Sequence, residues 1–363
     1  MQCFCSGANA RVRFSLLAGI VVNPVTADKE KEGMKMRSRW WSWWSGCALI
    51  AGLALAVTSC GRKTEEKPTA VTQPQPERPQ EQFLVAYAQS NMAETWRQAQ
   101  WEDAQEELKN HPELKVELSD AKQDNLTQIQ NVKNHLAKGI DLLIVCPNEA
   151  EALTPVVGEA YDSGIPVVVV DRAILNDKYT VFVGGDNYEI GKMAGEFIAK
   201  RLNGKGNVVE IEGQLGAPPT KLRSQGMHDV IKDYPDIKVV YKQTGEYLRM
   251  QGKEVMKNAL QASPDIDCVY AHNDEMILGA YQAAAEVGRG KEMIFIGVDG
   301  QKEVIESIRD GKITATYYYP TCGKEAIQIA ARLLAGEQLD KDIMLHTIEI
   351  TQENAEKNMH LGF

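Results

Sequence analysis

The feature that most constrains this chain is a regular alternation of short apolar runs with amphipathic stretches, which begins at Phe83. Continuous apolar runs such as Leu142–Val145 and Val167–Val170 are typical of strands that are buried on both faces of a sheet. Between residues 126 and 136, apolar residues recur at intervals of three or four, which is the spacing of one helix face. Strands that alternate with helices predict the α/β class, with parallel sheets covered by helices on both faces.

The alternation runs through two similar rounds, and the second round begins after Asp186-Asn187. The expected strands are residues 83–87, 114–118, 142–145, 167–170, 208–211, 237–241, 268–271 and 293–298. A chain of 363 residues is long enough for two domains of ordinary size. Two rounds within roughly 260 residues therefore predict two lobes of similar design.

The composition excludes some functions and some kinds of site. The formal net charge is −10, and no block of Lys and Arg occurs after the first forty residues. Nucleic-acid binding needs a basic face that neutralises phosphates, so no nucleic-acid partner is expected. The seven cysteines are scattered and include no Cys-x-x-Cys pair, so neither a disulfide framework, a metal site nor a cofactor is expected. Cys146, Cys268 and Cys322 lie in or beside apolar runs, which predicts buried thiols.

The first part of the chain has the pattern of a secretory signal. Basic residues at positions 35–39 precede an apolar segment at 40–57, and the sequence Val57-Thr58-Ser59-Cys60 follows. This ending resembles a bacterial lipobox, so residues 34–59 are expected to be a lipoprotein signal peptide and Cys60 the lipidated residue. Residues 1–33 are expected to reflect a misassigned start. The alternative is an uncleaved transmembrane anchor, because about twenty residues span a bilayer.

Residues 60–82 follow the lipobox and have a different composition from the body. They are rich in Lys, Glu, Gln and Pro and show no apolar periodicity, which predicts a flexible, solvated tether. A lipid on Cys60 and this tether would hold the folded body close to a membrane without embedding it. The protein is therefore expected to be extracytoplasmic and membrane-anchored, either in the periplasm or on the outer face of the cell membrane.

Polar and aromatic residues follow the carboxyl ends of the predicted strands, where open α/β sheets bind their ligands. The first lobe contributes Gln89, Asn91, Glu94, Trp96, Arg97, Asp171 and Arg172, and the second contributes Arg223, Tyr247, Asn273 and Asp299. Carboxylate, amide and guanidinium groups can grip vicinal hydroxyls in pairs, and an aromatic ring can cover the C–H face of a sugar. This set of residues predicts a polyol ligand, such as a small sugar.

Each of these residues also has a simpler structural interpretation. Asp171-Arg172 can be a local surface ion pair, and Asn273 or Asp299 can cap the following helix. Trp96, on the first turn of an expected helix, can belong to the core. The run Tyr317-Tyr318-Tyr319 is ambiguous, because alternate residues of a strand face opposite sides of the sheet.

The chain from Phe83 to about Glu356 resembles the periplasmic sugar-binding proteins of the ribose-binding class, and especially the galactofuranose-binding members. The segments that carry the resemblance are Val170-Asp171-Arg172, Gly185-Asp186-Asn187, Leu222-Arg223-Ser224-Gln225-Gly226, Ala271-His272-Asn273-Asp274-Glu275-Met276 and Gly297-Val298-Asp299-Gly300. The resemblance implies the type I periplasmic binding protein fold, with two Rossmann-like lobes joined by three hinge crossings. It places lobe I at 83–187 plus 320–347 and lobe II at 188–319 plus 348–363, with crossings near 186–187, 318–320 and 346–349.

The resemblance also implies roles for individual residues. Asp171 and Arg172 would grip sugar hydroxyls from the first lobe. The family's second-lobe ligands and its stacking aromatic fall on Arg223, Asn273, Asp299 and Tyr247, and its first binding loop falls on Gln89 to Arg97, where galactofuranose-type members share Trp96-Arg97. Two departures affect the choice of sugar: Cys146 stands where ribose binders have asparagine, and the tyrosine run replaces a polar hinge residue, whose contact is assigned to Tyr318.

The resemblance implies a monomeric lipoprotein that closes on a monosaccharide, a pentose or hexose and in some cases its furanose form, and delivers it to the permease of an ABC transporter. The alternative is a sensor that presents a sugar or furanosyl signal to a chemoreceptor or kinase. The absence of nucleophile-elbow, zinc-protease, phosphate-loop and dinucleotide motifs predicts that the chain is not an enzyme. A repressor would need a helix-turn-helix module before the first lobe, where this chain has the signal and tether. Replacing Asp171 by Ala is expected to abolish binding and to leave the fold intact.

Overall fold

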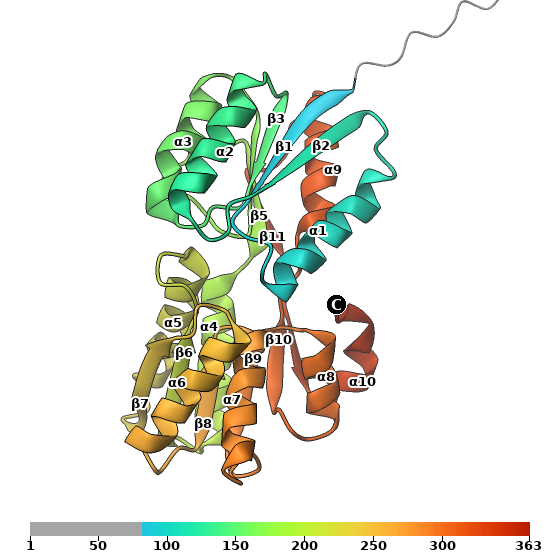
Figure 1. The fold of residues 1–363 in the computed structure, drawn as a ribbon. Coiled ribbons are helices and arrows are strands. Elements are labelled where there is room, and N and C mark those ends of the chain that lie inside the picture. Colours follow the sequence, from blue (N-terminus) through green and yellow to red (C-terminus); the bar gives the residue numbers. More distant parts are fainter. Residues whose placement is uncertain (1–81) are drawn as a thin grey trace, which may run out of the picture. The chain divides into compact units, whose positions relative to one another are not determined.

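Two six-stranded sheets, each covered by helices, make up residues 82–363, which are the part of the chain that the computed structural model describes (Figure 1). The lobe I sheet has the order β11-β5-β4-β3-β1-β2 and is parallel throughout. Its strands are β1 (Phe83–Gln89), β2 (Leu114–Asp120), β3 (Leu142–Val145), β4 (Val167–Val170), β5 (Val181–Gly185) and β11 (Asp342–Leu345). Its helices are α1 (Thr95–Leu108), α2 (Asn125–Ala137), α3 (Ala150–Asp162) and α9 (Gly323–Leu334).

The lobe II sheet has the order β12-β10-β9-β8-β6-β7 and repeats this design. Its strands are β6 (Lys205–Glu212), β7 (Asp236–Thr244), β8 (Cys268–Ala271), β9 (Ile294–Asp299), β10 (Ala315–Tyr318) and β12 (Ile348–Thr351). Its helices are α4 (Asn187–Arg201), α5 (Pro218–Ile231), α6 (Arg249–Ala262), α7 (Asp274–Glu286), α8 (Lys302–Arg309) and α10 (Ala355–Asn358), followed by a short 3₁₀ helix, Met359–Leu361. The two sheets confirm the prediction of a two-lobed α/β protein. Two details differ from it: β5, β10, β11 and β12 were not among the expected strands, and β12 pairs with β10 in antiparallel orientation.

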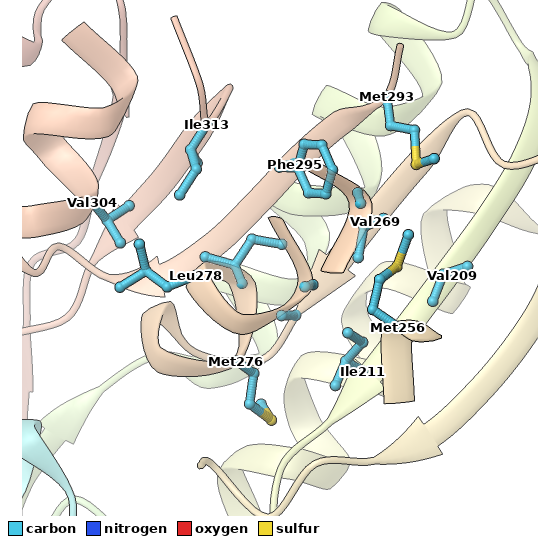
Figure 2. Packing of buried hydrophobic residues seen from close by; sticks show 14 of the residues in the cluster. Val209, Ile211, Met256, Val269, Met276, Leu278, Met293, Phe295, Val304 and Ile313 are labelled. Carbon is cyan, nitrogen blue, oxygen red and sulfur yellow. The ribbon is translucent and has the colours of Figure 1, made fainter. Parts of the chain in front are cut away.

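The core is built on strands whose central residues are nearly all apolar. In β1, Val85 and Tyr87 pack with α1 and α9 on one face of the lobe I sheet, whereas Ala86 and Ala88 pack with α2 and α3 on the other. All four side chains are fully buried. Because successive residues of a strand face opposite sides, only a continuous apolar run can fill both layers. The same rule holds in lobe II, where Figure 2 shows part of the cluster beneath α6, α7 and α8, including Met256, Leu278 and Phe295.

Two glycines let α4 and α5 pack unusually close together. A Cβ atom on Gly191 of α4 would lie 2.3 Å from the backbone oxygen of Arg223 in α5, and one on Gly226 of α5 would lie 2.2 Å from the backbone oxygen of Tyr188. Neither contact is possible for a residue with a side chain. The backbone of α5 is therefore fixed against α4 at Arg223, whose side chain lines the cavity described below.

The chain passes between the two sheets three times within the described residues: between β5 and α4, between β10 and α9, and between β11 and β12. The helix α5 begins at Pro218, about one turn before the predicted start at Leu222, because proline is well suited to a first helical position. No helix among residues 82–363 is both long enough and apolar enough to cross a membrane.

Candidate ligand-binding site

A small cavity of about 20 Å³ lies between the two lobes, at the carboxyl ends of their strands. It is lined by Glu94, Trp96, Arg97, Asp171, Arg172, Pro219, Arg223, Tyr247, Asn273, Asp299 and Tyr319. Nine of the twelve predicted site residues are in this set. The structure thus gathers in one place residues that are up to about two hundred positions apart in sequence, as expected where parallel strands end at a common edge.

Three of the lining residues have strained backbones. Asp171, Tyr247 and Asp299 have φ angles of 63°, 61° and 133°, a region that residues with side chains rarely adopt. The turn after Asp299 is fixed by Asp274, whose carboxylate accepts hydrogen bonds from the backbone N–H groups of the next two residues at 2.9 and 2.7 Å. Strain of this kind concentrates where a side chain must be aimed at a ligand.

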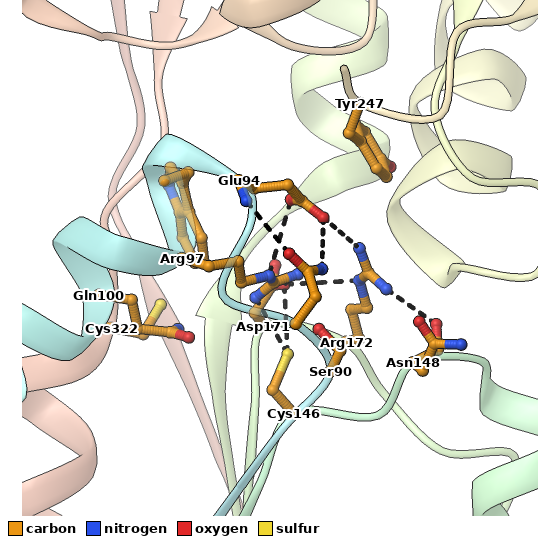
Figure 3. A network of polar contacts seen from close by, with 12 residues as sticks. Ser90, Glu94, Arg97, Gln100, Cys146, Asn148, Asp171, Arg172, Tyr247 and Cys322 are labelled. Atoms are coloured by element: carbon orange, nitrogen blue, oxygen red, sulfur yellow. Dashed lines mark hydrogen bonds and ion pairs between the residues drawn. The ribbon is translucent and has the colours of Figure 1, made fainter. Parts of the chain in front are cut away.

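The first-lobe wall is an ion-pair network around Asp171 (Figure 3). Arg97 Nη2 lies 2.7 Å from Asp171 Oδ2, and the Tyr319 hydroxyl donates to Asp171 Oδ1 at 2.8 Å. Arg97 also contacts the Cys146 sulfur at 3.0 Å. Burial alone would raise the pKa of the Asp171 carboxyl, but the guanidinium groups of Arg97 and Arg172 outweigh it and hold this pKa below its ordinary value. Asp171 is therefore an ionised, buried group and not half of a surface ion pair.

Several donors in this wall have no hydrogen-bond partner among the described residues. Arg172 Nη1 donates to the Asn148 carbonyl at 2.8 Å and to Gln214 Oε1 at 3.0 Å, but its Nε and Nη2 atoms make no hydrogen bond. Arg97 Nε is also buried without a hydrogen-bond partner. Carboxylate oxygens lie only at longer ion-pair distances from these atoms: Glu94 is 3.7 Å from Arg97 Nε and 3.8 Å from Arg172 Nη2, and Asp171 is 3.9 Å from Arg172 Nε. Buried donors left unpaired are costly, so the wall favours a ligand that is rich in acceptor oxygens.

The second-lobe wall is centred on Arg223. Its Nε donates to Asn187 Oδ1 at 2.8 Å, its Nη1 donates to the carbonyl of His272, and its guanidinium lies 4.8 Å from the centre of the Tyr319 ring. Two contacts fix the His272 ring: its Nε2 lies 3.2 Å from Glu210 Oε1, and its Nδ1 accepts from the Gly213 N–H at 3.5 Å. Burial lowers the pKa of His272, which favours the neutral imidazole with an Nδ1 that can accept.

Asp299 and Asn273 differ in how much of their hydrogen-bonding capacity remains. Asn273 caps α7 by accepting from the Met276 N–H at 3.0 Å, and its amide donates to the Tyr247 carbonyl at 3.1 Å. The helix-cap interpretation is thus correct for Asn273, although the residue also lines the cavity. Asp299 caps no helix, since α8 begins after Gln301. Burial and the neighbouring Asp274 carboxyl raise the pKa of Asp299 well above its ordinary value.

Three predicted site residues do not line the cavity. Asn91 donates to Glu94 Oε1 at 2.6 Å and so supports a lining residue from behind, whereas Gln89 donates to Gln100 Oε1 at 2.7 Å, away from the lining. The hinge contact assigned to Tyr318 belongs instead to Tyr319. The two residues face opposite sides of the chain, and Tyr318 packs against the lobe II core. Cys60, the predicted lipidation residue, lies outside the described residues, as do the predicted signal peptide and nearly all of the predicted tether.

Pro219, Tyr319 and Gln214 were not among the predicted site residues. The tyrosine run contained a signal for Tyr319, but the sequence did not specify which of its members faces the cavity. Gln214 lies just behind the lining and contacts lobe I from a lobe II loop. No spacing in the sequence points to it, because its partners depend on how the lobes meet. Among the described residues, no group of three or more His, Cys, Asp or Glu side chains could hold a metal ion.

Comparison with known proteins gives a consistent result. Residues 85–338 match the family model of the periplasmic binding protein domain. The ribose import binding protein of Bacillus subtilis is 38% identical over 232 residues, which are 63% of this chain and 75% of the relative. The galactofuranose-binding protein of Escherichia coli is 35% identical over 243 residues, or 64% of this chain and 76% of the relative. The fructose-binding periplasmic domain of a hybrid two-component system superposes with a TM-score of 0.74 at 40% identity, covering 77% of this chain and 93% of that structure.

The chain belongs to the periplasmic binding protein family, as its match to the family model over most of the folded body shows. This confirms the resemblance on which the sequence analysis relied. The curated relatives are binding proteins and not enzymes, which confirms the prediction that this chain is not an enzyme.

Proposed function

We propose that the protein is an extracytoplasmic sugar-binding lipoprotein that closes its lobes on a monosaccharide and delivers it to an ABC transporter permease. The observation that carries the proposal is the cavity lining, where guanidinium groups of lobe I with donors free of hydrogen bonds line the same cavity as the carboxyl of Asp299 from lobe II. A sugar hydroxyl both donates and accepts, so it can satisfy both walls at once. Contacts made to both lobes stabilise the closed form, which is the form that a permease would recognise.

The lining also supports a particular ligand class. Three guanidinium groups and three carboxyl groups surround the cavity, which suits a neutral polyol better than an ion of either sign. The rings of Trp96 and Tyr247 offer apolar surfaces for the C–H face of a sugar. The ligands in the names of the related proteins are ribose, galactofuranose and fructose, so the candidates are pentoses and hexoses, including furanose forms.

A thermal-shift screen of the body from Phe83 to Phe363 tests the binding function. A ligand that binds only the folded state should stabilise it by about 2.7 kcal/mol at a concentration one hundred times its dissociation constant. The panel should contain ribose, arabinose, galactose, galactofuranose, fructose and inositol. A clear rise in Tm with one of these supports the proposal and identifies the ligand. No shift with any of them would contradict the proposed class.

Sensing is the second candidate function, because one of the similar structures is the periplasmic domain of a hybrid two-component system. A sensor and a transport protein would close in the same way, so the distinction lies in the partner. Deleting the gene should abolish uptake of the identified sugar if the protein serves a transporter. Normal uptake together with a lost transcriptional response to that sugar would favour sensing.

Anchoring rests on the sequence Val57-Thr58-Ser59-Cys60 at the end of an apolar segment. Replacing Cys60 by Ser removes the thiol that would carry the lipid and, with it, processing at this position. If the segment is a lipoprotein signal, cell fractionation should show loss of the mature lipidated form and failure to incorporate labelled palmitate. A variant that stays in the membrane fraction with its wild-type size would favour the uncleaved anchor.

A further inference from the structure

Gln214 connects the two lobes beside the ligand cavity. It lies in the lobe II loop between β6 and α5, and its side-chain amide contacts lobe I at both ends. Gln214 Nε2 donates to Asn148 Oδ1 at 3.1 Å, and Gln214 Oε1 accepts from Arg172 Nη1 at 3.0 Å. One amide group thus satisfies an acceptor and a donor that are both presented by the opposite lobe.

The two lobe I groups in this contact, Asn148 and Arg172, are oriented by hydrogen bonds within their own lobe. The Asn148 amide nitrogen donates to Asn125 Oδ1 at 2.7 Å and to the Gln123 carbonyl at 3.2 Å, so its orientation leaves Oδ1 toward Gln214. The Asn148 carbonyl accepts from Arg172 Nη1 at 2.8 Å, which places that donor beside it. A group that completes this pair must donate and accept within one short planar unit, and a side-chain amide does so.

The contact is buried, and Gln214 itself does not line the cavity. Asn148 and Arg172 are each 1% exposed and Gln214 is 7% exposed, so opening the lobes would separate polar groups that fit each other in a dry environment. By accepting from Nη1, Gln214 also fixes the guanidinium of Arg172 and leaves Nε and Nη2 without hydrogen-bond partners, with Asp171 and Glu94 at ion-pair distances of 3.9 and 3.8 Å. Those two atoms are the ones available to a ligand.

The opposite side of the cleft carries a weaker connection. Thr95 of α1 donates to Glu275 Oε1 of α7 at 3.0 Å, at an exposed position where water competes for both groups. Glu275 is already held by Arg249, whose Nε lies 2.8 Å from Oε2. The Thr95 contact therefore contributes little to closure, and the buried contact of Gln214 contributes more.

We propose that Gln214 is a positioning residue that latches the closed form and fixes Arg172 for the ligand without touching it. This role rests on the proposed function, since it concerns the closure that accompanies sugar binding. A latch of this kind acts on the equilibrium between open and closed forms. It raises the affinity for every ligand by the same factor, whereas a ligand contact changes the preference among ligands.

The test uses Gln214→Met, which keeps the length of the side chain and removes both hydrogen bonds, together with Gln214→Ala. Titration calorimetry with D-ribose and D-fructose should show affinities weakened on the order of 10- to 100-fold, as expected for a buried hydrogen bond to a charged group. The ratio of the two dissociation constants should not change, and stopped-flow measurements should assign the loss to faster dissociation. Thr95→Ala should stay within about threefold of the wild type, and Gln261→Ala, at an exposed position on α6, should be unchanged.

A ligand-free measurement separates this proposal from the proposed function. Spin labels at the exposed positions 133 on α2 and 254 on α6 report the distance between the lobes. Both Gln214 variants should shift the distance distribution toward the open form. Wild-type affinity in Gln214→Met, or an altered preference between the two sugars, would overturn the latch. If the wild type binds neither sugar, the ligand proposal loses its support, and an unchanged distance distribution would then overturn the latch independently.

Discussion

Replacing Asp171 by Asn is expected to weaken sugar binding by at least about 100-fold, because it removes the charge that organises the first-lobe wall. The amide has the shape of the carboxylate and can still accept from the Tyr319 hydroxyl, which donates at 2.8 Å in the wild type. It cannot balance the charge of Arg97, whose Nη2 lies 2.7 Å away. Titration calorimetry with the sugar identified by the thermal-shift screen measures the loss. Wild-type affinity would place the binding site elsewhere.

The same substitution should also destabilise the fold, contrary to the expectation from the sequence alone. Asp171 is only 5% exposed, and its removal leaves Arg97 as a buried charge without its partner. Breaking a buried pair in this way typically costs about 3–5 kcal/mol. Thermal unfolding at pH 7 should therefore show a lower Tm for Asp171→Asn, whereas Asp236→Asn, at an exposed position on β7, serves as the matched control and should not change it.

The difference in stability between the wild type and Asp171→Asn should depend on pH with a definite sign. The pKa of Asp171 is lowered in the folded state, so its stabilising contribution is fully present above the ordinary aspartate pKa of about 3.9. The difference in stability between the wild type and Asp171→Asn should be equal at pH 7 and pH 5. It should shrink only as the pH falls below about 4 and toward the lowered pKa.

Gly191→Ala is expected to damage stability and binding together, although Gly191 touches no ligand. Its new Cβ would lie 2.3 Å from the backbone oxygen of Arg223 and 3.0 Å from the Arg223 Cα, so α4 and α5 must separate. Overpacking of this kind typically costs about 1–3 kcal/mol. Because α5 carries Arg223, we also expect an affinity loss of about tenfold. Denaturant unfolding and calorimetry on one preparation measure the two effects.

Gly158→Ala provides a matched control for this prediction. Gly158 also lies inside a helix, α3, but the nearest atom to an added Cβ would be the flexible Lys178 Cδ at 3.3 Å. Alanine is favoured over glycine in a helix interior, so this variant should be as stable as the wild type or slightly more stable. If Gly191→Ala behaved like Gly158→Ala, the close packing of α4 on α5 would not constrain the site.

The fold was predictable because most of its central strands, such as β3, β4 and β8, are apolar at every position. A run such as Val167–Val170 has few alternatives to a strand covered on both faces, and it was placed correctly. The strands β5, β10, β11 and β12 were not predicted. β5 ends in two glycines, and β11 and β12 are short and partly exposed, so neither burial nor period distinguishes them from loops.

Most of the residues that line the cavity were predictable for a topological reason, and the errors in that prediction concern single residues. Parallel strands bring their carboxyl ends to one edge, so Asp171 and Asp299 could be placed together without knowing any side-chain contact. The choice between Tyr318 and Tyr319 required the direction of each side chain, and a run of three identical residues carries no such information. Gln214 required the relative placement of two lobes, which no local pattern in either lobe encodes.

The brevity of the three passages between the sheets has a mechanical consequence. Only Asp186 separates β5 from α4, and only His346 and Thr347 separate β11 from β12, while residues 319–322 connect β10 to α9. Three short connecting segments permit the lobes to rotate about a common axis and resist sliding or separation of the lobes. If the lobes close on a ligand as proposed, the motion has close to one degree of freedom. A pair of fluorophores on the two lobes would then report closure as a single change of distance, which makes this scaffold suitable for a reagentless optical sensor.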